Sequence, residues 1–103
     1  MSQSHQPEPD QVQFSDLSGF QRDILSSIAR HGPSNGLDIQ GHLRRLYSED
    51  INPPRVYDNL EKLKDKGLID KSKLDGRSNT YAVTDEGREI MRAYAKWVVQ
   101  SLE

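Results

Sequence analysis

One predicted helix in the middle of the chain carries arginine, asparagine and lysine on a single face. Arg55, Asn59 and Lys62 follow one another at helical spacing. An arginine fork or a carboxamide forms two parallel hydrogen bonds with paired groups on a partner, whereas lysine acts as a point charge toward an anion. This set therefore favours recognition of a polar, anionic surface through hydrogen bonds.

A second set of basic and polar side chains surrounds a predicted turn at Asp75-Gly76 and comprises Lys71, Lys73, Arg77, Ser78 and Asn79. A helix followed directly by a hairpin with a basic tip is typical of winged-helix DNA-binding domains. In such a domain we expect arginine to meet guanine, and asparagine to meet adenine, in the major groove. An arginine at the turn suits the narrow minor groove.

Three other positions on the helix extend this interpretation. Asn52 and Tyr57 join the candidate DNA-binding residues; the Tyr57 hydroxyl either lies at the rim of the packed core or bonds a phosphate. Asp58 would repel phosphate, so it either orients a neighbouring arginine or accepts from cytosine. Lys62 suits a phosphate contact. The alternative is an ordinary solvated helix face beside a loop whose charge keeps the protein monomeric.

Local signals define the limits of this helix and of the hairpin that follows. We expect Asn52 to cap the helix through its side chain, and Pro53 suits the first helical position. Gly67 ends the helix after a lysine-rich last turn. Strands are predicted over 68–73 and 80–83. The apolar stripe that buries the helix consists of Val56, Leu60 and Leu63.

Two further helices are predicted upstream. The first begins near Ser15 or Ser18 and ends at His31-Gly32-Pro33, and its buried face consists of Phe20, Ile24, Leu25 and Ile28. Ser34 or Asn35 caps the second, roughly 36–47, whose inward side chains are expected to be Leu37 or Ile39, Leu43, Leu46 and Tyr47. After it, Ile51 is expected to pair with Tyr81 or Val83 as a short strand.

The last helix is predicted to form a homodimer interface. Thr84 caps it, and five of its side chains present more apolar surface than so small a domain covers alone: Met91, Tyr94, Trp97, Val98 and Leu102. A two-fold dimer would place two recognition helices about 34 Å apart, one turn of DNA. The alternative is that this helix folds back on the first helix of its own chain.

Composition narrows the possible function classes. With 33% hydrophobic residues in 103, the chain supports one small core without a deep catalytic cavity, and it has no cysteine. No apolar run reaches membrane-spanning length, which predicts a cytoplasmic protein. The net charge of −2 argues against nucleic-acid binding. However, residues 52–83 hold seven Lys or Arg against five Asp or Glu, which gives a weakly basic segment.

Neither catalysis nor a metal or cofactor site is predicted. The sequence shows no nucleophile–base–acid set and no glycine-rich phosphate loop before a helix. The histidines His5, His31 and His42 do not form a metal-binding pattern. Asp38 and His42 share a helical face, which would supply half of a metal site or, more simply, a surface hydrogen bond.

The ordered motifs resemble the PadR family of winged-helix transcriptional regulators, within the wider MarR-like group. The residues that carry the resemblance lie between about 18 and 92 and include Val56-Tyr57-Asp58-Asn59-Leu60, Lys66-Gly67-Leu68-Ile69, Tyr81 and Thr84-Asp85-Glu86-Gly87-Arg88. Short members with one C-terminal helix, including haloarchaeal regulators, are the most similar. The Pro53-Pro54 entry and Asp58 depart from the family, which puts its sequence preference, not the fold, in doubt.

The sequence therefore predicts an α+β winged helix-turn-helix with three helices, a two-stranded β-hairpin wing and a C-terminal dimerisation helix. Its expected parts are a flexible arm (1–14), a DNA-binding domain (15–84) and the dimerisation helix (85–103). The expected function is a homodimeric regulator bound to a pseudo-palindromic operator in double-stranded DNA. The alternative is a protein-interaction module that meets an acidic partner. The operator sequence, the direction of regulation and any inducer are not readable from the sequence.

Overall fold

The computed structural model describes residues 12–74 and 78–103 of the chain. The elements follow in the order η1 (Phe14–Asp16), α1 (Gly19–His31), β1 (Ser34–Asn35), α2 (Gly36–Tyr47), α3 (Pro53–Asp65), β2 (Ile69–Leu74), β3 (Ser78–Val83) and α4 (Asp85–Ser101). This order confirms the predicted winged helix. The predicted turn at Asp75-Gly76, Arg77 and the first eleven residues of the predicted arm lie outside the described residues.

Local capping confirms most of the predicted helix limits. The Ser18 hydroxyl accepts from the Gln21 backbone N–H, and the Gln21 side chain accepts in return, so that α1 begins with a capping box. Asn35 and Thr84 cap α2 and α4 through one bond each: their side-chain oxygens accept from the backbone N–H groups of Asp38 and Gly87. Gly67, with φ of 78°, takes up the left-handed conformation that ends α3.

The sheet corrects one prediction. Its antiparallel strands lie in the order β1-β3-β2, and β1 pairs Ser34 with Tyr81 and Asn35 with Thr80. The expectation that Ile51 supplies the third strand was wrong, because the α1–α2 connection occupies that edge of β3. Ile51 is instead buried in the core, and its carbonyl accepts from the Gln40 side chain at 2.8 Å.

The core confirms the predicted buried faces of α1 and α3, and in α2 it selects Ile39 of the two alternatives, whereas the prediction that Leu46 points inward was wrong. Ile39 and Leu43 are fully buried, but Leu37 is 68% exposed and Leu46 is 61% exposed. Leu37 lies two residues before Ile39, which puts it on the other side of the helix. Leu46, in the last turn, lines a surface groove with His31 and His42 instead of joining the core.

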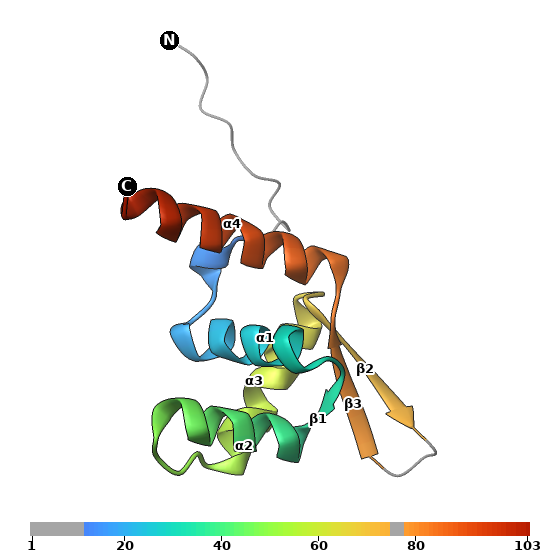
Figure 1. Cartoon of the computed structure of the whole chain (residues 1–103). Coiled ribbons are helices and arrows are strands. Elements are labelled where there is room, and N and C mark those ends of the chain that lie inside the picture. The colour runs from blue at the N-terminus through green and yellow to red at the C-terminus, as the bar shows by residue number, and fades with distance from the viewer. Residues whose placement is uncertain (1–11, 75–77) are drawn as a thin grey trace.

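The helices and the hairpin give the molecule two distinct surfaces (Figure 1). In this view α4 runs across the top of the domain and α2 lies at the bottom, with α1 between them. Helix α4 contacts η1, α1 and β3, whereas α3 contacts α2, α1 and β2. The exposed parts of α3 and the wing therefore form one surface and α4 forms another. Among residues 12–74 and 78–103, no helix is long and apolar enough to cross a membrane.

Gly87 provides a test of how closely α4 packs on the start of the wing. A Cβ at this position would collide with the backbone carbonyl of Leu68 and the Val83 side chain. We expect Gly87→Ala to lower the free energy of unfolding by about 1–3 kcal/mol in urea titrations. The matched control is Gly41→Ala in α2, where a Cβ meets nothing within 4 Å, and we expect it to raise stability by about 0.5–1 kcal/mol. Equal effects of the two substitutions would contradict this packing.

Candidate nucleic-acid interface

The rotation of α3 determines which of its side chains meet solvent. Val56, Leu60 and Leu63 have no exposed surface, so they direct one side of the helix into the core. The helix N-terminus and the opposite side are open to solvent, and their exposed residues include Asn52, Arg55, Asp58 and Lys62. The predicted polar face of α3 is therefore accessible to a partner.

Asn52 occupies the N-cap position of α3, but its side chain makes no capping hydrogen bond, contrary to the prediction. The two residues that follow are prolines, which have no backbone N–H to donate. The next N–H, that of Arg55, already donates to the Asn52 carbonyl at 3.0 Å. The Asn52 carboxamide is therefore left at the exposed start of the helix.

Arg55 lies on an aromatic platform supplied by α1 and α2. Its guanidinium carbon is 3.8 Å from the centroid of the Phe20 ring, and Phe20 stacks on Tyr47 with centroids 6.0 Å apart. The Tyr47 hydroxyl donates to Asp23; burial, followed by this bond, raises the pKa of Tyr47 to about 12. Stacking occupies the face of a guanidinium but not its edge, so the N–H donors of Arg55 stay available.

Asn59 is tied to the protein at both ends of its amide. Its Oδ1 accepts from Nε2 of Gln21 at 3.0 Å, and its Nδ2 donates to the Arg55 carbonyl at 2.8 Å. In this conformation Asn59 joins α3 to α1 and supports the turn that carries Arg55. Nothing in the local sequence signals this bond, because Gln21 lies 38 residues earlier.

Tyr57 packs on the protein and remains partly accessible, and a bond from its hydroxyl to phosphate stays a prediction. Its side chain is 40% exposed, and its ring covers Gly36 at the start of α2 so closely that a Cβ there would overlap the ring. The ring therefore joins the N-terminal ends of α2 and α3. The packing depends on glycine at position 36, which the sequence pattern did not indicate.

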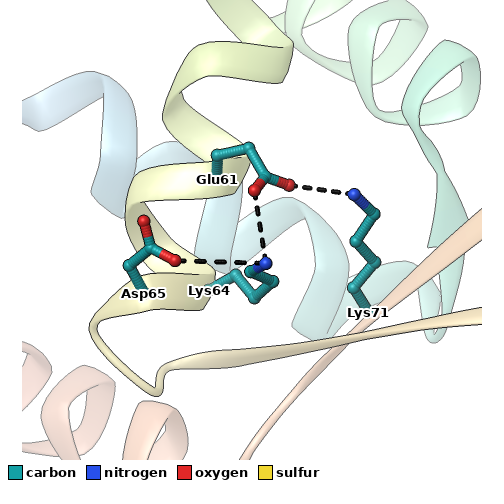
Figure 2. A network of polar contacts seen from close by, with 4 residues as sticks. All are labelled: Glu61, Lys64, Asp65 and Lys71. Carbon is teal, nitrogen blue, oxygen red and sulfur yellow. Dashed lines mark hydrogen bonds and ion pairs between the residues drawn. The ribbon is translucent and has the colours of Figure 1, made fainter.

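The wing carries fewer free charges than the sequence indicated. Lys71 donates to Glu61 of α3 at 3.0 Å, and Lys64 lies 3.3 Å from the other oxygen of the same carboxylate (Figure 2). The hydrogen bond from Lys71, and after it the one from Lys64, holds the pKa of Glu61 below its usual value. The same bond between Lys71 and Glu61 raises the pKa of Lys71. Neither Glu61 nor Lys64 was among the predicted site residues.

Further along the hairpin, Lys73 of β2 is exposed and pairs in register with Asn79 of β3, which is half-buried. Ser78 begins β3 through its backbone. Lys73 and Asn79 therefore lie together toward the far end of the wing, as predicted from their spacing around the turn.

The candidate dimerisation residues of α4 divide into an inner and an outer group. Met91 packs on the core. The centroid of the Tyr94 ring lies 5.2 Å from that of Phe14 and 4.6 Å from the guanidinium carbon of Arg22. Trp97 and Leu102 remain 57% and 82% exposed, although Phe14 also approaches Trp97 at 6.0 Å. Helix α4 therefore packs on its own chain, as one alternative predicted, and it also exposes apolar side chains. The homodimer stays a prediction.

The histidines of α1 and α2 lie together, which the sequence did not predict. The rings of His31 and His42 stack with centroids 3.6 Å apart, and Nδ1 of His42 lies 3.3 Å from the Ser27 hydroxyl. The pKa of His42 is lowered, mainly by burial and to a smaller extent by the nearby His31, which favours the neutral form of His42. In the described part of the chain, no three His, Cys, Asp or Glu side chains gather in a group suited to a metal ion.

Comparison with known proteins identifies the family. The model of the Transcriptional regulator PadR-like family matches residues 24–93, from within α1 to within α4. The chain belongs to this family. The predicted resemblance is confirmed, and the chain is a PadR-like transcriptional regulator.

Individual relatives agree with this assignment. The chain is 34% identical over 62 residues to the transcriptional activator GvpE2 of Halobacterium salinarum, and the match covers 60% of this chain and 32% of GvpE2. The chain thus spans about a third of the length of that curated relative. The complex structure of hsRosR-S4 superposes with a TM-score of 0.83 at 36% identity, covering 89% of this chain and 79% of that one.

Two more solved structures extend the comparison. RosR of H. salinarum, from crystals grown with NaBr, has a TM-score of 0.79 at 38% identity, with 84% of this chain and 77% of RosR covered. Bacillus subtilis PadR in complex with operator DNA has a TM-score of 0.65 at 23% identity, with 76% of this chain and 47% of PadR covered. The likeness to PadR shows the shared winged-helix fold.

The bond between Asn59 and Gln21 makes a prediction that separates a structural role from DNA contact. Asn59→Ala leaves the Nε2 group of Gln21, a residue only 7% exposed, without its acceptor. We expect the free energy of unfolding to fall by about 1–3 kcal/mol in urea titrations. Lys62→Ala, on the exposed side of the same helix, is the control and should stay within about 0.5 kcal/mol of the unaltered protein. If the two variants have the same free energy of unfolding, the Asn59 amide does not stabilise the fold.

Proposed function

We propose that this regulator binds a pseudo-palindromic operator as a homodimer in the cytoplasm, with α3 in the major groove and the wing at the minor groove. The observation that carries the proposal is the accessible N-terminal half of α3, where the guanidinium of Arg55 is held on the Phe20 ring beside exposed Asn52 and Tyr57. A side chain fixed in this way loses little conformational freedom when it meets a base edge.

The dimensions of α3 suit this placement. The helix has 13 residues and therefore a length of about 20 Å, and its diameter fits the major groove, about 12 Å wide. Arg55 is the candidate for a guanine contact, and Lys62 for a phosphate. Asn59 supports Arg55 in the free protein, and an adenine contact would require it to exchange its bond with Gln21.

The wing supplies the second part of the DNA contact. Lys73 and Asn79 stand toward its far end, and the sequence places Arg77 and Ser78 at or beside the turn. An arginine in a narrow minor groove is attracted by the negative electrostatic potential there. It responds to the shape of the DNA more than to its base sequence. Lys71 belongs to the same strand, but its ion pair with Glu61 sets it apart from the other candidates.

Dimerisation through α4 would bring two copies of this DNA-binding surface together. Trp97 and Leu102 are the most accessible of the five candidates. Met91, Tyr94 and Val98 are half-buried and line a groove with Leu25 of α1, so they would give the interface a packed base. Burial across a two-fold axis removes this apolar area from water at about 25 cal/mol per Å², before the cost of association.

Fluorescence anisotropy with labelled duplex DNA over a salt series tests the proposed function. A DNA-binding regulator should lose affinity steadily as salt rises, because each phosphate contact releases counterions. Binding that is absent, or insensitive to salt, would instead favour the alternative of a protein-interaction module. An operator selected from a random duplex pool then supplies the specific probe.

For Arg55→Ala we expect binding to the selected operator to weaken by about 1–3 kcal/mol, with a much smaller loss on random duplex, since a base contact is lost. Anisotropy titrations with both probes measure the difference. Arg92→Ala, which removes an exposed arginine of α4, is the matched control and should change neither affinity. Equal losses of Arg55→Ala on both probes would limit this residue to the DNA backbone.

Trp97→Ala tests the dimer. Because the ring is 57% exposed in a single chain, its removal should leave the fold intact and weaken self-association by about 2 kcal/mol or more, roughly 30-fold. Sedimentation velocity over a micromolar concentration range measures the shift toward monomer, and operator affinity should fall with it. Lys96→Ala, on the same helix, is the control. A variant that stays dimeric at these concentrations would exclude Trp97 from the interface.

A further inference from the structure

Glu61 lies where α3 meets the wing, and both of its carboxylate oxygens are occupied by lysines. Oε2 accepts from Nζ of Lys71 on β2 at 3.0 Å, and Oε1 lies 3.3 Å from Nζ of Lys64 on α3. Lys64 also reaches Asp65 at 4.0 Å, as Figure 2 shows. The charges of these four side chains cancel, so the junction of helix and wing carries no net attraction for an anion.

The position of this cluster makes the cancellation relevant to DNA binding. Lys71 is in the strand that leads to the tip of the wing, two residues before the exposed Lys73. Its side chain is 32% exposed and that of Glu61 is 45% exposed, so both are within reach of solvent and of a docked duplex. An exposed ion pair of this kind adds little to folding stability. Its main effect would be on the binding of a nearby phosphate.

A free lysine at this junction would add affinity for any DNA sequence. Each lysine–phosphate contact strengthens binding irrespective of the bases and makes it more dependent on salt. A carboxylate that accepts from the same ammonium group competes with the phosphate for its hydrogen bonds, and it also repels the phosphate directly. Loss of non-specific affinity raises the ratio of specific to non-specific binding, the quantity on which a regulator depends.

We propose that Glu61 is a specificity-determining residue, which withholds Lys71 and Lys64 from the phosphate backbone and so lowers affinity for DNA of arbitrary sequence. The inference rests on the proposed DNA-binding function. Glu61 touches no base in this role and acts through the two lysines. Its carboxylate also joins β2 to α3, so that specific binding gains less than non-specific binding when the charge is removed.

Glu61→Gln is the informative variant, because glutamine keeps the size and a hydrogen-bond acceptor and removes only the charge. Anisotropy titrations use a labelled random-sequence duplex over a salt series, a probe that requires no knowledge of the operator. We expect E61Q to bind this duplex about three- to tenfold more tightly at about 0.1 M salt, and to steepen the slope of log K against log salt by about one unit. A general loss of structure would weaken binding and cannot produce this result.

Two controls define the cause. Glu89→Gln on α4 makes the same change of net charge at an exposed residue that has no ion pair among the described residues, and it should leave the slope unchanged. In the double variant E61Q/K71Q most of the gain should disappear, since Lys64 still has Asp65 as a partner and Lys71 is left without its carboxylate. Circular dichroism and thermal unfolding establish that each variant is folded.

The outcomes separate the two levels of the proposal. If the unaltered protein binds duplex DNA with the expected salt dependence but E61Q behaves like E89Q, Glu61 has no such role and the proposed function stands. A gain in E61Q that survives the removal of Lys71 overturns the route through that lysine. If the unaltered protein shows no salt-dependent binding of duplex DNA, the proposed function fails and this inference fails with it.

Discussion

Burial of one stripe of α3 is the constraint on which the rest of the structure depends. Val56, Leu60 and Leu63 have no exposed surface, and full burial of each such side chain stabilises the fold by about 1.5–3 kcal/mol. This fixes the rotation of the helix and therefore the direction of its polar side. Leu68 and Ile69 are buried directly after it, so the same core also fixes the direction in which the wing leaves the body. Helix α3 and the wing are thus aligned by apolar packing.

Much of the fold was predictable because its signals are local. Capping residues such as Ser18 and Thr84, and the glycine that ends α3, act on neighbours within a few positions. The apolar stripes of α1 and α3 follow from helical periodicity alone. The prediction for β1 was wrong because Ile51 and Ser34–Asn35 compete for one edge of β3, and only the packed helices decide which of them reaches it.

The candidate site was predictable in its position but not in its contacts. Arg55 and the wing lysines were found from residue type and spacing, whereas their partners come from distant parts of the chain. Phe20 beneath Arg55, and Glu61 beside Lys71, meet these side chains only after α1, α3 and β2 have packed. The same packing explains why formal charge is a poor guide here. The basic segment includes an acid that neutralises part of it, so the surface seen by a partner differs from the sum of its residues.

The place of β3 in the sheet has a consequence for the motion of the wing. Near Tyr81 and Thr80, β3 is paired on both sides, by β1 and by β2, whereas toward Ser78 and Asn79 it is paired with β2 alone. Local opening requires less free energy where fewer backbone bonds must break. Amide hydrogens should therefore exchange with solvent slowly at the base of the wing and progressively faster along it. Because β1 lies between α1 and α2 in the chain, it ties the base of the wing to the helices. We therefore expect the far part of the wing to bend more easily than its base.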